Sequence, residues 1–180
     1  MNRLLGLTRG FPGHPSHPPF TDATIGAFTV GTILVLLSWL GLSESKTVGG
    51  GLLALVAGLL LAVPTIVTGL IDYIDIPRGT ARWRMATVHW LAMVSATSVF
   101  LVAAALLQDD FDGGRARAGG ALCAIGALLL LTLGGWLGGT LVFVHGERVL
   151  ALPEEPTLRA VVPNDIERSP VPEVDAPEGR

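Results

Sequence analysis

Four long apolar stretches divide the chain, and short polar connections separate them. They cover about residues 22–42, 48–71, 86–107 and 118–144. Each is close to the roughly 20 apolar residues that an α-helix needs to cross the hydrocarbon core of a bilayer. Because the connections are short, successive helices should pack as antiparallel neighbours. The pattern therefore predicts an all-α fold, an integral membrane four-helix up-down bundle.

The segments that flank this bundle have a different character. Prolines and histidines are concentrated before the first apolar stretch, where Thr21 and Asp22 are expected to begin the first helix as its N-cap and first-turn acid. The C-terminal segment is acidic and holds six of the 12 prolines, a composition that buries too little apolar surface to order itself. We therefore expect an N-terminal His-Pro segment (1–21), a transmembrane domain (22–149) and a flexible tail (150–180).

Composition excludes several classes of protein. Half of the residues are apolar and only 15% are charged, against about a quarter in soluble domains. A net charge of −3 argues against nucleic-acid binding, and a single cysteine excludes a disulfide framework. The chain also lacks a phosphate loop, an HExxH motif and a nucleophile elbow. The lipid bilayer is thus the expected solvent, and no catalytic motif identifies a reaction, although electron transfer needs none.

Basic residues near the predicted spans are distributed unequally between the two sides. Seven arginines fall on the side of both termini, and three basic residues fall on the other side. Since cytoplasmic loops carry the excess of Lys and Arg, both termini are expected in the cytoplasm.

The four histidines lie toward one membrane face in this topology, and an acidic and a basic residue share their layer. Imidazole is the commonest metal ligand and an axial ligand of haem. Without a cysteine cluster, such a site suits haem b or a transition metal ion such as iron, copper or zinc. Arginines in this layer would pair the haem propionates. The candidate ligands are His14, His17, His89 and His145, supported by Asp72 and Arg78.

Two features of this layer allow more than one interpretation. His14 and His17 each precede a proline, which favours extended backbone. In extended backbone the two residues would stand about 9 Å apart and serve two separate sites. A turn would instead bring them together at one site, and both arrangements are open. Glycines on the second and fourth spans form stripes, with Gly134 and Gly138 leading toward His145. These stripes are either packing faces or room for a flat ligand between helices.

Several of these residues together resemble a family of four-helix bacterial membrane proteins catalogued as domain of unknown function 2231. The resemblance covers about residues 13–149 and rests on the segments Gly13–Pro18, Thr68–Tyr73 and Gly134–Val149, with His89 between them. It implies a bacterial inner membrane protein that carries the four histidines and Asp72. Relatives joined to Rieske-type domains imply a membrane redox complex or Rieske-type partner. The chain departs from the family pattern at Met93, where similar proteins often have asparagine, and at Thr21-Asp22, where they have a more apolar run.

Three functions fit these observations. The first is a haem- or metal-binding, redox-linked membrane subunit. The second is a structural or assembly subunit whose polar layer only satisfies itself and whose tail binds a partner; self-association as a homo-oligomer is compatible with both. The third is a small permeation or proton-relay protein that uses Asp72 and His89, although no deeper acid or histidine would carry a proton across.

Overall fold

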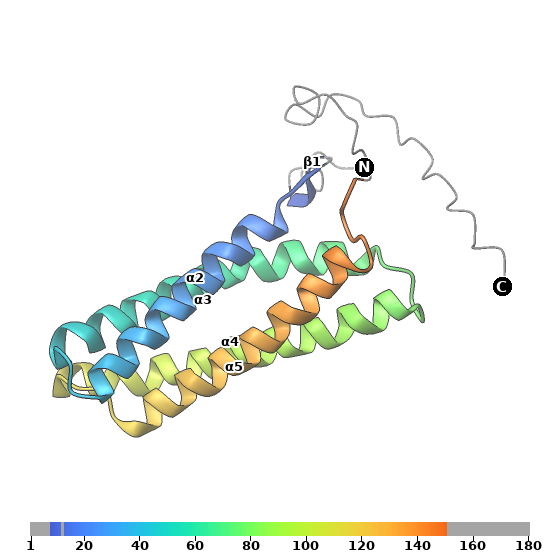
Figure 1. Cartoon of the computed structure of the whole chain (residues 1–180). Coiled ribbons are helices and arrows are strands. Elements are labelled where there is room, and N and C mark those ends of the chain that lie inside the picture. The colour runs from blue at the N-terminus through green and yellow to red at the C-terminus, as the bar shows by residue number, and fades with distance from the viewer. Residues whose placement is uncertain (1–7, 12, 151–180) are drawn as a thin grey trace, which may run out of the picture.

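The computed structural model describes residues 8–11 and 13–150, and these form a four-helix bundle (Figure 1). The helices are α2 (His17–Trp39), α3 (Glu44–Ile74), α4 (Ala81–Gly113) and α5 (Ala118–Phe143). Each of the four is long and apolar enough to cross a membrane. Two short strands, β1 (Gly10–Phe11) and β2 (His14–Pro15), pair antiparallel before α2. The predicted membrane bundle is therefore confirmed.

The predicted flexible tail, residues 150–180, lies outside the described residues except for Leu150. Residues 1–7 and 12 of the predicted His-Pro segment also lie outside them.

The bundle consists of two antiparallel pairs. Helix α2 packs mainly on α3, and α4 packs mainly on α5, whereas α2 and α5 share the smallest of the four interfaces between neighbouring helices. Helix α2 begins, α3 ends, α4 begins and α5 ends at the same end of the bundle (Figure 1). We call this the His end.

The first helix begins earlier than the sequence predicts. Ser16 is its N-cap, and Pro18 and Pro19 occupy its first turn. Proline is tolerated there because first-turn amides have no partner within the helix. The predicted cap at Thr21 is therefore wrong: the Thr21 hydroxyl instead donates to the carbonyl of His17 within the helix, at 2.9 Å. This early start gives His17 helical backbone instead of the predicted extended conformation.

Glycines allow the helices of the first pair to approach closely. A Cβ added at Gly58 would lie 2.6 Å from the ring of Phe28, and one added at Gly31 would lie 2.7 Å from Leu55. Gly51 meets Val35 in the same way. The glycine stripe of the second span is thus a packing face along this part of α3, as one of the two interpretations predicted.

An aromatic stack joins the two helix pairs. Phe28 on α2 and Phe100 on α4 are fully buried, and their rings are 4.0 Å apart between centroids and nearly parallel. At the opposite end of the bundle from the His end, the Asp110 carboxylate, 2% exposed, accepts a hydrogen bond from the Arg117 amide at 2.8 Å. The stack therefore holds the two pairs together at mid-bundle, whereas Asp110 fixes the α4–α5 turn. This turn contacts the first pair, where the Ala116 amide donates to Ser38 Oγ at 3.0 Å.

Replacing Gly58 by alanine is expected to lower the free energy of unfolding by about 1–3 kcal/mol, because the new methyl group overpacks the interface against Phe28. Gly26→Ala on α2 is the matched control: nothing lies within 4 Å of an added Cβ there, so helix propensity should leave it neutral or slightly stabilising. Unfolding by sodium dodecyl sulfate in mixed micelles measures both. Equal stability of the two variants would contradict the packing interpretation.

Candidate functional site

A cavity of about 450 Å³ lies between the two helix pairs at the His end. We call it the slot. Helices α2 and α3 form one wall, and α4 and α5 form the other. Its volume is within the range of about 300–1,000 Å³ typical of small-molecule sites. The residues that line it are mainly apolar side chains and glycines, among them Ile25, Ala62, Ile66, Met93, Val94 and Gly135.

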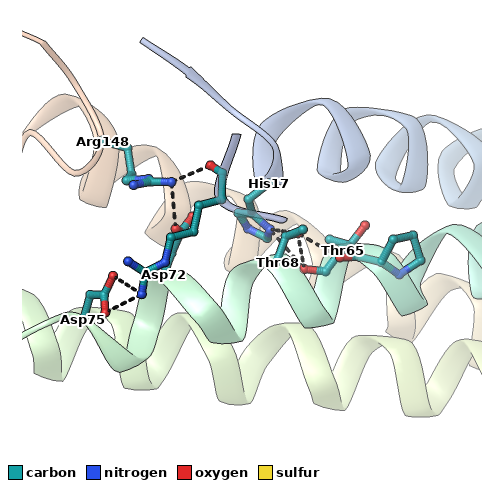
Figure 2. A network of polar contacts seen from close by, with 8 residues as sticks. His17, Thr65, Thr68, Asp72, Asp75 and Arg148 are labelled. Atoms are coloured by element: carbon teal, nitrogen blue, oxygen red, sulfur yellow. Dashed lines mark hydrogen bonds and ion pairs between the residues drawn. The ribbon is translucent and has the colours of Figure 1, made fainter. Parts of the chain in front are cut away.

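His17 lines the α2–α3 wall, and its partners fix its orientation. Its Nδ1 lies 3.0 Å from the carbonyl oxygen of Thr65 and 3.2 Å from Thr68 Oγ1 (Figure 2). The tautomer that carries hydrogen on Nδ1 donates it to the carbonyl, and Nε2 then keeps its lone pair. The Thr21 hydroxyl, 3.4 Å from Nε2, already donates to the backbone. His17 Nε2 is therefore available as a ligand atom.

His89 lines the opposite wall in the same manner. Its Nδ1 lies 2.7 Å from the carbonyl oxygen of Gly134 on α5, which again selects the tautomer with hydrogen on Nδ1. Its Nε2 has no hydrogen-bond partner among the described residues. Histidines that bind metals characteristically donate their other ring N–H to a carbonyl or carboxylate. Both slot histidines, His17 and His89, thus have the second interaction that such a ligand needs.

Each slot histidine also lies against a glycine one helical turn beyond its carbonyl partner. A Cβ added at Gly69 would lie 2.7 Å from Cε1 of His17, and one added at Gly138 would lie 3.0 Å from Cε1 of His89. The acceptors, Thr65 and Gly134, precede these glycines by four residues. The same arrangement of imidazole, carbonyl and glycine therefore occurs in both helix pairs.

This correspondence extends along the bundle. Phe28 and Phe100, which stack on each other, each follow a slot histidine by 11 residues. Val35 and Leu107 follow by 18 residues and lie against Gly51 and Gly120. The two helix pairs are thus an internal repeat with matching contacts. The slot histidines occupy equivalent positions in the two repeats, on opposite walls of the slot.

Ion pairs form a layer at the His end beyond the histidines. The guanidinium of Arg148, after α5, lies 3.2 Å from the Asp72 carboxylate and donates to the carbonyl oxygen of Arg9 at 2.6 Å (Figure 2). The Arg9 guanidinium in turn lies 2.8 Å from the Asp75 carboxylate. Arg82 and Glu147 are 3.3 Å apart. Asp72, Glu147 and Arg148 also line the slot. The strand segment before α2 and the segment after α5 are thereby tied to each other and to α3.

The other predicted site residues do not line the slot. His14 is exposed in β2, outside the helices. His145 is half-buried in the turn after α5, because the helix ends at Phe143 and the chain turns through Gly146 at a φ of 64°. The prediction that His145 continues the Gly134–Gly138 face is therefore wrong. Arg78 is exposed in the α3–α4 loop and makes no ion pair with a described residue, and Asp72 pairs with Arg148.

The structure consequently brings together two of the four predicted histidines, with Asp72 at the edge of the slot. Within residues 8–11 and 13–150, no three His, Cys, Asp or Glu side chains are arranged to hold a metal ion. Sequence reasoning missed the carbonyl acceptors, and it did not place Gly69 and Gly138, which we call the cradle glycines, against the histidine rings. The equal spacing of 11 residues from His17 to Phe28 and from His89 to Phe100 is a signal in the sequence that could have singled out this pair.

Comparisons with known proteins agree with the fold. A family model described as a predicted membrane protein, DUF2231, matches residues 13–151, more than three quarters of the 180 residues. No curated protein and no solved structure matches the chain.

Proposed function

The chain belongs to the DUF2231 family of predicted membrane proteins, and from this premise we propose that it is a haem-binding membrane subunit that transfers electrons. One observation carries the proposal: two equivalent imidazoles, each with Nδ1 bonded to a carbonyl, line opposite walls of an otherwise mainly apolar slot. Both rings line the same cavity between the helix pairs. His17 and His89 would hold a haem bound in the slot, one residue from each helix pair.

The number of ligands favours haem over a free metal ion. A bound zinc ion usually takes three or four protein ligands, and the described residues provide no group of three. In haem the porphyrin supplies four nitrogens, so the protein needs to supply only axial ligands. The apolar lining of the slot suits the macrocycle in the same way. His17 and His89 are therefore the proposed axial ligands.

The remaining groups have supporting roles. The carbonyls of Thr65 and Gly134 hold the imidazoles in one tautomer and raise their basicity. At the His end, Arg148 lines the slot and Arg82 pairs with the slot-lining Glu147, so both are candidates to pair the propionates in exchange for their present carboxylate partners. When bound, the haem iron supplies one-electron chemistry.

The proposal is tested by titrating the purified full chain with ferric haem in detergent and recording the visible spectrum before and after dithionite. We expect one haem per chain and the low-spin spectrum of two imidazole ligands. A protein that binds no haem, or binds it without these spectral features, would contradict the proposal and favour the structural or assembly role, in which the polar layer satisfies only itself.

Replacing the cradle glycines tests how the imidazoles are positioned. Gly69→Ala or Gly138→Ala forces the adjacent ring to move, and we expect haem affinity to fall by about 10-fold or more, as it does when a ligand loses its outer-shell support. Gly126→Ala on α5 is the control, since an added Cβ there meets nothing within 4 Å. Spectral titration measures all three variants. Unchanged affinity at both cradle positions would argue against the proposed ligand geometry.

We further propose that the His end faces the cytoplasm, because basic residues favour that side. A cysteine introduced at the exposed Arg78, in a Cys123→Ser background, should react with a membrane-impermeant thiol reagent only in inside-out vesicles. Labelling from the outside would reverse the orientation. A Rieske-type or other redox partner belongs to the same proposal and would be sought at this end.

A further inference from the structure

The slot lies between two helix pairs, so it has two sides: one between α2 and α5, and one between α3 and α4. Lining residues on both sides are exposed. Pro18 and Asp22 on α2 and Phe143 on α5 are exposed, and so are Ile66 on α3 and Trp90 on α4. A ligand therefore has three routes into the slot: either of the two sides, or the His end.

The internal repeat allows the two sides of the slot to be compared by the size of the side chains that α3 and α5 place there. Ile66 and Gly135 are equivalent, since each follows a carbonyl acceptor by one residue, and Leu70 and Gly139 are equivalent because each follows a cradle glycine. Helix α3 thus has two branched side chains where α5 has none. An added Cβ at Gly135 meets nothing within 4 Å, and one at Gly139 meets only the Phe143 ring, at 3.9 Å.

The side chains of α2 and α4 differ in size in the same way. Pro18 and Trp90 each follow a slot histidine directly, so the large indole is on the α3–α4 side and the small ring is on the α2–α5 side. Helices α2 and α5 also share the smallest interface between neighbouring helices. The α2–α5 side is therefore the less obstructed of the two.

The His end is more restricted than this side. Pro15, Arg148 and Val149 line the slot there, and the Arg148–Asp72 and Arg9–Asp75 ion pairs tie their segments to α3. By contrast, the exposed lining residues on α2 and α5 include Pro18 and Phe143, with Asp22 as a charged residue among them, and Phe143 is 87% exposed where the surrounding medium is the bilayer.

We infer that haem reaches the slot laterally from the bilayer, between α2 and α5, with Gly139 leaving the passage open and Phe143 at its edge. The inference rests on the proposed function and adds a route to it: the chain would take an amphipathic porphyrin from the membrane, its apolar ring entering first and its propionates staying at the His end. Membrane-dissolved haem is thus the form that the protein receives.

The test follows the absorbance change as the full chain, reconstituted in phosphatidylcholine vesicles, takes up ferric haem already dissolved in those vesicles. Gly139→Leu introduces the side chain of Leu70, the equivalent residue on α3, and should slow haem uptake about tenfold. Phe143→Ala should accelerate it. Gly126→Leu, the same substitution elsewhere on α5, should take up haem at the wild-type rate, and so should Asp75→Asn, which breaks a tie at the His end.

Equilibrium titration in detergent separates this inference from the proposed function. Wild-type protein that binds haem, together with Gly139→Leu and Phe143→Ala variants that load at the wild-type rate, would overturn the lateral route alone. Faster loading by Asp75→Asn would assign entry to the His end and would overturn it too. Wild-type protein that binds no haem in detergent would overturn both. If Gly139→Leu fails to bind haem at equilibrium, the rate of Phe143→Ala against wild type decides.

Discussion

Replacing His17 or His89 by alanine is expected to weaken haem binding more than about 100-fold, which corresponds to about 2.7 kcal/mol. Each substitution removes one of two axial ligands and leaves a carbonyl, of Thr65 or Gly134, without its imidazole donor. Spectral titration of the full chain in detergent measures the effect. Because the histidines are equivalent in the internal repeat, the two variants should lose affinity to a similar extent.

His14→Ala is the matched control for this experiment. His14 belongs to the same His-Pro segment as His17, but it is exposed and does not line the slot. Its replacement should leave the affinity and the spectrum unchanged. A loss of binding in His14→Ala equal to that in His17→Ala would contradict the assignment of ligands. A gain of high-spin character in His89→Ala, with His17 retained, would support axial ligation by His89.

The largest effect on stability is expected at the aromatic stack. Phe100→Ala should lower the free energy of unfolding by about 3–5 kcal/mol, the range for truncating a buried phenylalanine, because the ring is fully buried and stacks on Phe28 at 4.0 Å. Unfolding by sodium dodecyl sulfate in mixed micelles measures it. Phe111→Ala, on the same helix but 53% exposed, is the control and should cost much less.

The two rings of the stack, Phe28 and Phe100, should contribute to stability jointly. The double variant Phe28→Ala/Phe100→Ala should cost less than the sum of the single variants, since the first truncation already removes the contact between the rings. Strict additivity would show that the two rings stabilise their own helix pairs independently and do not hold the pairs together.

The pattern of long apolar stretches was sufficient to predict the fold but not the helix ends. Long apolar stretches bounded by polar residues predict membrane helices because the bilayer requires backbone hydrogen bonds to be satisfied within each segment. The start of α2 and the end of α5 depend on local contacts instead: prolines accommodated in a first turn, and a chain that turns after Phe143. Those two boundaries decided that His17 faces the slot and that His145 does not.

By itself, the sequence determined the solvent of this protein, its four helices, the family and the residue types available for a site, because hydropathy, segment length and motif spacing are properties of the linear chain. Tertiary structure decided which histidines share a cavity, which carbonyls orient them and which side of the slot is open. These depend on how α2–α3 packs against α4–α5. The physical reason is that a ligand site needs side chains from helices distant in sequence, and their relative rotation is set by close packing at positions such as Gly58 and Phe100.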